Sequence, residues 1–242
     1  MINPNVTPQI DIDEIRSVVE KTTDKQRDYS INIRGRKIFL SALPSVYLSK
    51  GFGDDFGDSG FFARELHKIV NGSLLEIGAG SGIISIATFL LKKGRIKIVT
   101  TDLNPNAIKS VRINLKNNNL ARQIEVREGS MFDPIKEGEK FDFIFWNHPF
   151  HRGNASESYT QITSFDPMFK GFHEYIKSGH TFLEKNGKLL LGTGNFADLD
   201  DMRTIVDKNR CTMKLLRWIH KPIALKGGEF NTFNIYEITR RD

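Results

Sequence analysis

The stretch LLEIGAGSG, from Leu74 to Gly82, decides the fold of this chain. An apolar run leads into three glycines, Gly78, Gly80 and Gly82, and a second apolar segment follows them. Because glycine tolerates positive φ and a close approach of the backbone to a ligand, this pattern predicts a strand that turns into a helix around a bound molecule. The dinucleotide fingerprint G-x-G-x-x-G needs a glycine at position 83, where this chain has Ile83. The departure disfavours a nicotinamide-dependent dehydrogenase.

Strands and helices alternate downstream of this turn. Apolar periodicity predicts strands at 73–77, 96–100, 124–127, 141–146 and 188–191, and helices at 83–92, 105–117, 166–184 and 197–208. Such alternation predicts a parallel sheet with helices on both faces. Two more strands, 213–219 and 230–239, are joined by a short connection containing Gly227 and Gly228, so they are most simply antiparallel. We therefore expect an α/β fold with a mostly parallel seven-stranded sheet whose last strand is antiparallel.

The residues upstream of the glycine turn follow a different pattern. A short helix is predicted at 11–21, a strand at 31–40, a loop rich in Gly and Asp at 45–60, and a helix at 61–70. The interpretation is an N-terminal extension at 1–44 and one larger domain at 45–242.

Composition sets the broad class of the protein. With 242 residues, 39% of them hydrophobic and 26% charged, the chain can bury one good core. The single cysteine excludes an internal disulfide framework and a thiolate metal cluster, which favours a reducing cytoplasm. The N-terminus lacks the features of a secretory signal, and no apolar run is long enough to cross a bilayer. The six histidines show no ligand spacing, so no metal site is expected.

The formal charge of +6 suits an anionic partner such as RNA, but many proteins without nucleic-acid partners carry a similar excess. Charge alone therefore leaves contact with nucleic acid open.

Two further segments point to the ligand of the glycine turn. Asp102 lies about twenty residues beyond the glycines, where such folds place an acidic ligand for a ribose diol. A carboxylate there accepts two strong, charge-assisted hydrogen bonds. The segments TDLNPNA, from Thr101 to Ala107, and GSMFD, from Gly129 to Asp133, together with the glycine turn, resemble those of class I S-adenosylmethionine-dependent methyltransferases.

That resemblance implies a Rossmann-like class I methyltransferase fold with S-adenosylmethionine as the cofactor. Glu76 would lie near the ammonium group of the methionine moiety, Asp102 on the ribose and Leu103 beside the adenine. Ser130 stands where the family most often has an aspartate for the adenine amino group, so this contact is weaker or made by the backbone. The complete set expected at the cofactor is Glu76, Gly78, Gly80, Gly82, Asp102, Leu103, Ser130, Met131 and Asn147.

The tetrapeptide Asn147-His148-Pro149-Phe150 follows the strand 141–146 at its carboxyl end, the edge at which open α/β sheets bind ligands. It resembles the Asn-Pro-Pro-Tyr/Phe motif of methyltransferases that act on planar nitrogens. The resemblance implies that the Asn147 side-chain oxygen and the backbone carbonyl of His148 accept hydrogen bonds from the target NH₂, while Phe150 packs on the planar group. An amide or aryl amine is a poor nucleophile because its lone pair is delocalised. Positioning and electrostatics then carry the rate.

His148 departs from the family motif, which has proline there. Pro149 still favours an extended residue 148, and the imidazole is either a base or substrate ligand, or simply packed or solvated. His151 and Arg152 either meet an acidic substrate group or decorate a surface loop.

Upstream, Asp58 and Ser59 match a lid pair that lies near the cofactor in the family. Phe52 and Phe56 either cover the site or anchor the loop.

The sequence thus indicates an N-methyltransferase whose acceptor is RNA, a protein glutamine or a small metabolite. A non-catalytic protein that binds the cofactor as a sensor or interaction partner is the rival class, and a nicotinamide oxidoreductase is a distant third. The oligomeric state is left open.

Overall fold

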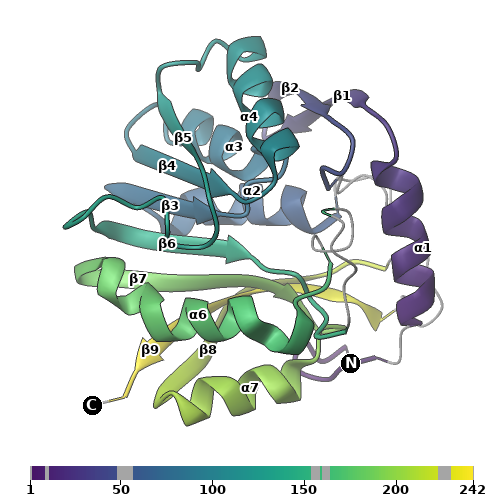
Figure 1. Cartoon of the computed structure of the whole chain (residues 1–242), viewed down its shortest axis with the longest axis vertical. Helices are drawn as coiled ribbons and strands as arrows, with labels where there is room; N and C mark the ends of the chain where they lie inside the picture. Colours follow the sequence, from purple (N-terminus) through teal and green to yellow (C-terminus); the bar gives the residue numbers. More distant parts are fainter. Residues whose placement is uncertain are drawn as a thin grey trace.

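A computed structural model of the chain describes residues 2–8, 11–47, 57–153, 159, 164–222 and 230–241. Within these residues, seven strands form one sheet in the order β5-β4-β3-β6-β7-β9-β8 (Figure 1). The strands are β3 (Ser73–Ile77), β4 (Lys97–Asp102), β5 (Ile124–Glu128), β6 (Phe141–Asn147), β7 (Leu183–Gly194), β8 (Cys211–His220) and β9 (Thr232–Arg240). β9, the last in sequence, is antiparallel to both β7 and β8, and the other pairs are parallel. The predicted fold class is confirmed.

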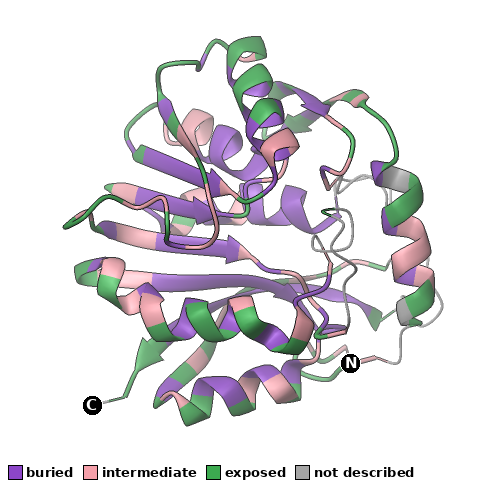
Figure 2. Cartoon of the chain, in the orientation of Figure 1, coloured by how far each residue is buried: buried purple, intermediate pink, exposed green. Residues whose placement is uncertain are grey.

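Helices cover both faces of the sheet. One face packs against α2 (Gly57–Ile69), α3 (Ile83–Leu91) and α4 (Pro105–Asn117), and the other against α6 (Lys170–Ser178) and α7 (Leu199–Lys208). Because successive side chains of a strand point to opposite faces, Leu74 joins the first core cluster and Leu75 the second, and Phe145 and Ile144 divide in the same way. Figure 2 shows the result: buried central strands, and helices that are exposed only on their outer sides.

The long helix predicted at 166–184 is wrong in extent. It is broken into a 3-10 turn (Pro167–Phe169), α6 and a second 3-10 turn (Gly179–Phe182), and β7 begins at Leu183. Met168 and Phe169 have positive φ values of 57° and 52°, which no continuous α-helix accommodates. Asn186 and Gly187 lie at an irregularity inside β7, where pairing with β6 passes from Leu183 to Lys188.

The single strand predicted at 31–40 is a hairpin of β1 (Arg27–Ile33) and β2 (Arg36–Ala42). Arg34 and Gly35 connect the two strands with φ values of 52° and 80°. Two consecutive positive φ values form the tight connection that matches the twist of paired strands.

The N-terminal elements share the core of the larger domain. α1 (Ile12–Thr23) begins after Asp11, whose carboxylate accepts from the backbone N–H of Asp13 and of Glu14, and it buries Ile15 and Val19 in the first core cluster. The hairpin rests on α4, where the Asn114 side-chain oxygen accepts from the Ser41 N–H at 2.6 Å. Figure 1 shows α1 beyond the carboxyl ends of the parallel strands. The division at 44/45 stays a prediction.

The helix expected at 61–70 begins earlier, at Gly57, so Asp58 and Ser59 lie in its first turn and not in a loop. Phe52, Phe56, Gly227 and Gly228 lie outside the described residues. In the described part of the chain, no helix combines the length and apolarity needed to cross a membrane.

Candidate active site

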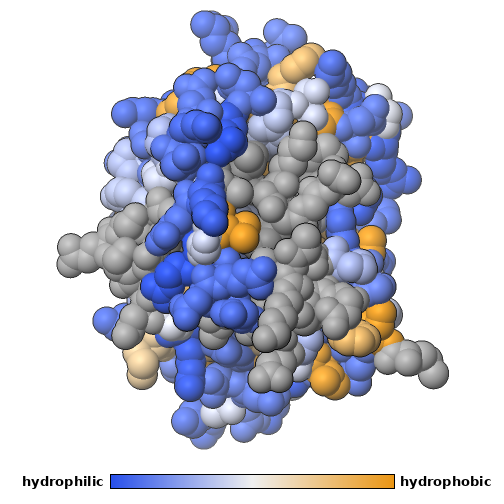
Figure 3. Space-filling view, turned by 90° about the vertical axis from the view of Figure 1, so that its right-hand side faces the viewer, coloured by the Kyte–Doolittle hydropathy of each residue, from blue (hydrophilic) through white to orange (hydrophobic). Residues whose placement is uncertain are grey.

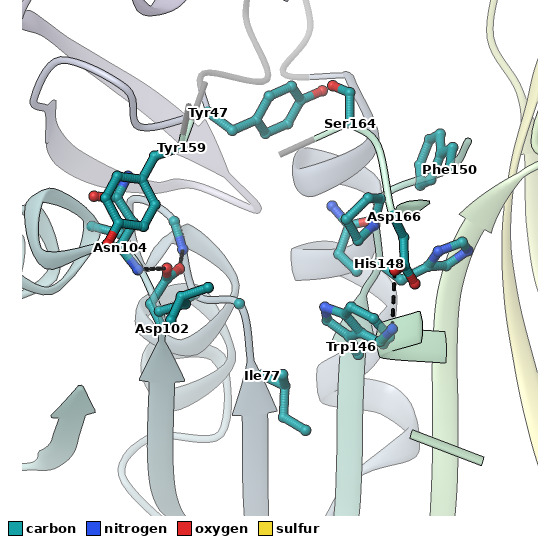
Figure 4. A pocket seen from close by; sticks show the side chains of 18 of the residues that line it. Tyr47, Ile77, Asp102, Asn104, Trp146, His148, Phe150, Tyr159, Ser164 and Asp166 are labelled. Atoms are coloured by element: carbon teal, nitrogen blue, oxygen red, sulfur yellow. Dashed lines mark hydrogen bonds between the residues drawn. The ribbon is translucent and has the colours of Figure 1, made fainter. Parts of the chain in front are cut away.

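A cavity of about 490 Å³ opens at the carboxyl ends of β3, β4 and β6 (Figure 4). Four chain segments that the sequence singled out line it: Gly78–Ser81, Asp102–Asn104, Gly129–Met131 and Trp146–His151. They are far apart in sequence and meet because parallel strands bring their carboxyl ends to one edge of the sheet.

The glycine turn has the predicted backbone. Gly78, Gly80 and Gly82 have φ values of 67°, 55° and 79°. A Cβ atom on Gly78 would lie 3.2 Å from Nε1 of Trp146, whereas one on Gly80 would meet no atom within 4 Å. The absence of a side chain at Gly78 therefore allows Trp146 to pack closely against the glycine turn. Gly80 lies where a ligand can approach the backbone. Gly82 does not line the pocket; it caps the N-terminus of α3.

Asp102 is fixed by two backbone groups. Its carboxylate accepts from the N–H of Gly80 and from the N–H of Asn104, each at 2.8 Å. Burial raises the pKa of Asp102 to about 6, against the lowering effect of these hydrogen bonds. Figure 4 shows Asp102 and Asn104 on one wall of the pocket and Trp146 and His148 on the other. A rigid carboxylate on this wall can accept hydrogen bonds from a diol.

Beside Asp102, the pocket offers an apolar surface. Leu103 is 44% exposed, which is high for a leucine, and it lines the pocket together with Ser130 and Met131. Met131 has a φ of 44°, so the backbone turns sharply at this point. These residues form a ledge on which a flat ring can lie.

Glu76 lies beneath the glycine turn and is not among the lining residues. It is 1% exposed and accepts hydrogen bonds from the hydroxyls of Ser85 and Thr100. Burial raises its pKa to about 8, so the side chain is mainly neutral at pH 7 in the free protein. Its contact with a ligand ammonium stays a prediction.

Asn147 is held in one orientation by Asp58. The Asn147 side-chain NH₂ donates to the Asp58 carboxylate at 2.8 Å, and the Asn147 side-chain oxygen is buried with no hydrogen-bond partner in the described residues. The reverse orientation would set that oxygen against the carboxylate. Asp58 also accepts from the Tyr47 hydroxyl at 3.2 Å and from the Ser59 N–H at 2.6 Å. Burial raises the pKa of Asp58 above its ordinary value, while these hydrogen bonds lower it.

His148 is a packed residue of the pocket wall. It is 2% exposed, and its Nε2 lies 3.2 Å from the Thr193 hydroxyl oxygen. Its ring centroid lies 5.6 Å from that of Trp146 and 5.5 Å from that of Phe172. Burial lowers the pKa of His148 to about 3, so the ring is neutral at pH 7 and a weak base. The geometry supports positioning of the loop, and a chemical role for the ring stays a prediction.

The last two residues of this loop, His151 and Arg152, differ in exposure. His151 is buried and lines the pocket, whereas Arg152 is exposed and pairs with Asp201 at 2.8 Å. Proximity in sequence gave no sign of this division.

Sequence reasoning missed several lining residues. Four of them, Ile15, Phe165, Phe196 and Phe233, come from separate parts of the chain and belong to no motif, so no local pattern marks them. Tyr47 lies within the predicted loop 45–60, and a tyrosine hydroxyl eleven residues before the Asp-Ser pair is the signal that was available. In the described residues, no group of three or more His, Cys, Asp or Glu side chains is placed to hold a metal ion.

Comparison with known proteins gives one family over most of the chain. The model of the methyltransferase small domain family matches residues 37–214. That match begins inside the β1–β2 hairpin, so α1 and β1 lie outside it.

Individual relatives are similar over part of their length. A ribosomal RNA small subunit methyltransferase C from Psychromonas ingrahamii is 26% identical over 192 residues, which are 78% of this chain and 49% of that protein. A putative protein N5-glutamine methyltransferase from Methanocaldococcus jannaschii is 36% identical over 135 residues, 56% of this chain and 61% of that protein. The chain thus spans about half to three fifths of the length of these curated relatives.

Among solved structures, the fold is similar to that of a T. thermophilus 16S rRNA N2 methyltransferase in complex with AdoMet and guanosine. The TM-score is 0.63 with 18% sequence identity, and the match covers 90% of this chain and 51% of that one.

Proposed function

Because this chain belongs to the methyltransferase small domain family, we propose that it transfers a methyl group from S-adenosylmethionine to a nitrogen atom of a planar amide, a nucleobase amine or a small-molecule acceptor. The observation that carries the proposal is the Asn147 side-chain oxygen, a buried acceptor left unpaired while Asp58 fixes the other end of the amide. Such an atom is what an NH₂ group needs for binding in a defined direction.

The residues of the pocket fit the cofactor. Asp102 suits the ribose hydroxyls, the backbone at Gly80 permits close approach, and the ledge of Leu103 and Met131 suits an adenine ring. When bound, S-adenosylmethionine supplies an electrophilic methyl group on a sulfonium. The wall of Asp102 and the wall of Trp146 and His148 face each other across the cavity, which leaves room for an acceptor beside the cofactor.

The chain contributes orientation of the acceptor. The Asn147 side-chain oxygen and the His148 backbone carbonyl each accept a hydrogen bond from one N–H of the methyl acceptor. These two hydrogen bonds direct the lone pair of its nitrogen along one line. Phe150 would pack against the side of the methyl acceptor. The centroid of the Phe150 ring lies 5.8 Å from that of His148 and 5.0 Å from that of Phe196. Asp58 acts through Asn147 as a positioning residue. The Asn147 oxygen and the His148 carbonyl are fixed before the reaction begins and therefore need little reorganisation in the transition state.

The test uses labelled methyl transfer to fractionated cell extract, treated separately with ribonuclease and protease. The variant Asn147→Ala should lose turnover by about a hundredfold or more, the scale found when one preorganised polar contact is removed. Its affinity for S-adenosylhomocysteine should stay close to that of the wild type.

The matched control is Asn71→Ala, because Asn71 is exposed and bonds only Lys92 in the described structure. Unchanged turnover in Asn147→Ala would refute the role of Asn147. A wild-type protein that binds the cofactor and labels no fraction points to the rival class, a sensor or interaction partner.

The relatives act on ribosomal RNA and on protein glutamine, by their names, and both acceptors enter the proposal beside a small metabolite. We also propose that residues 1–44 form an extension that helps select the acceptor, since Ile15 lines the pocket and the Tyr29 hydroxyl lies 3.4 Å from the Ser81 hydroxyl. The cytoplasm is the proposed compartment because the chain has one cysteine.

A further inference from the structure

We propose that His151 binds the acceptor directly, and that the part of the acceptor entering the pocket is an uncharged heteroaromatic amine. The inference rests on the proposed function and adds to it a specificity-determining residue and a class of acceptor. It comes from His151, a pocket-lining residue of the Asn147–Arg152 loop to which the methyl-transfer geometry gives no task.

The His151 ring is buried and unpaired. It is 3% exposed, and neither ring nitrogen has a hydrogen-bond partner in the described residues. The ring lies between two phenylalanines, with centroids 5.9 Å from Phe165 and 6.2 Å from Phe196. All three of these side chains line the pocket.

The backbone holds this ring in place. The His151 N–H donates to the carbonyl of Ser164 at 3.2 Å, and the His151 carbonyl accepts from the Asp166 N–H at 2.7 Å. These bonds fix the backbone at His151, and packing against Phe165 and Phe196 holds the ring itself. A buried polar atom without a partner destabilises a fold unless a ligand pairs with it, so a fixed and unpaired imidazole on a pocket wall is a ready contact for a ligand.

The charge of the pocket limits what the ring can bind. Burial lowers the pKa of His151 to about 4, so at pH 7 the imidazole is neutral and offers one donor and one acceptor. No Lys or Arg stands among the described lining residues, while Asp58, Asp102 and Asp166 do. Arg152 is exposed and paired with Asp201, and Arg16 lies over the Phe165 ring, 4.7 Å from its centroid, without lining the pocket. An anionic group in this cavity would therefore find no cation in the described lining to pair with, which favours an uncharged acceptor.

The shape of the lining favours a ring over a side-chain amide. The ring centroids of Phe150 and Phe196 lie 5.0 Å apart, edge to face, and those of Phe196 and Phe233 lie 5.8 Å apart. These rings give the pocket several aromatic surfaces. Aromatic side chains stabilise a stacked base strongly, and a glutamine amide offers little area for such contact. Figure 3 shows that the described surface on the α1 side is mostly hydrophilic, whereas Phe196 and Phe233 are buried in the pocket wall.

The experiment measures binding of guanosine, adenosine and cytidine to protein saturated with S-adenosylhomocysteine, by calorimetry, with N-acetylglutamine methylamide as the amide probe. We expect at least one nucleoside to bind the wild type. His151→Phe keeps a ring of similar size and removes both nitrogens, and it should weaken that nucleoside by about tenfold or more, as expected for loss of one well-formed hydrogen bond. His151→Gln, which keeps a donor and an acceptor, should recover part of the loss.

The matched control is His180→Phe, because His180 lies outside the pocket beside Cys211 and should leave nucleoside binding unchanged. His151→Phe should melt at the same temperature as the wild type or higher, because an unpaired polar ring is replaced by an apolar one. A lower melting temperature together with lost binding would mean that His151 is structural, and would overturn the proposal. Equal nucleoside affinity in His151→Phe would also overturn it.

Binding of the glutamine probe without binding of any nucleoside refutes the acceptor class and leaves methyl transfer to nitrogen standing. Failure of the wild type to bind S-adenosylhomocysteine refutes the proposed function itself, and this inference with it. The two failures are therefore distinguishable.

Discussion

Replacing Glu76 by glutamine separates two accounts of this residue. The resemblance to methyltransferases places a carboxylate near the ammonium of the cofactor, whereas the structure buries Glu76 under the glycine turn with the hydroxyls of Ser85 and Thr100 as partners. Glu76→Gln keeps the size of the side chain and an oxygen that accepts from both hydroxyls. It removes the ionisable group, so any difference from the wild type that depends on pH reports the charge of Glu76.

The magnitude follows from the pKa of Glu76. In the folded protein burial raises that pKa from 4.5 to about 8, so folding favours the protonated form. The stabilisation is fully present below the unfolded pKa and is lost as the pH rises through the folded one. Since one pKa unit corresponds to about 1.4 kcal/mol, the free energy of unfolding of the wild type falls by up to about 5 kcal/mol across this range because of Glu76 alone. Other titrating groups are shared with the variant and cancel in the comparison.

The assay is urea unfolding of both proteins at a series of pH values from about 5 to about 9. The stability of Glu76→Gln relative to the wild type should increase steadily with pH and level off above about pH 8. A relative stability that does not change with pH refutes the neutral, buried carboxyl. In parallel, calorimetry with S-adenosylhomocysteine should give equal affinities at pH 7. A tenfold loss in the variant would instead support a carboxylate on the ammonium.

Two further predictions concern the residues that grip the ligands. With the pKa of Asp102 raised to about 6, affinity for S-adenosylhomocysteine should be constant above about pH 7 and fall as the pH drops through 6, because the ribose hydroxyls need the carboxylate. Asp102→Asn should bind weakly with no such dependence, and a parallel profile in calorimetry contradicts the assignment. Asp58→Asn should lower turnover by about tenfold, since a charge-assisted hydrogen bond to Asn147 exceeds a neutral one by about 1.5 kcal/mol, with cofactor affinity retained. Unchanged kcat would remove Asp58 from the positioning of Asn147.

The sequence predicts the sheet and half of the site because those parts depend on local pattern. Strands buried on both faces are continuous apolar runs, and their carboxyl ends meet at one edge in any parallel sheet, so Asp102 and the glycine turn had to be neighbours. Their hydrogen bond, from Gly80 to Asp102 at 2.8 Å, spans only one strand–helix–strand unit.

The other half depends on contacts that no local pattern encodes. Asn147 and Asp58 are 89 residues apart, and only the fold reveals that one orients the other. The hairpin at Arg34-Gly35 was missed because arginine is an unusual residue at positive φ, and the break before α6 was missed because Met168 and Phe169 continue a helical apolar pattern while adopting positive φ. His151 and Arg152 are adjacent in sequence, yet the fold buries the first in the pocket wall and exposes the second, which pairs with Asp201.

The charge of the whole chain and the charge of its pocket have opposite signs, and they act at different ranges. The excess of six positive charges comes from side chains outside the cavity, while the described lining carries carboxyl groups and neutral imidazoles. At physiological ionic strength exposed charges are screened over about 8 Å, so the surface can attract a polyanion without setting what enters the pocket. Nearby carboxylates suit a positively charged sulfonium cofactor. His151 and the phenylalanines of the pocket wall suit an uncharged ring. A positive surface that favours RNA as a partner is therefore compatible with an uncharged acceptor group. The surface would attract the polyanion, and the pocket would bind the uncharged group.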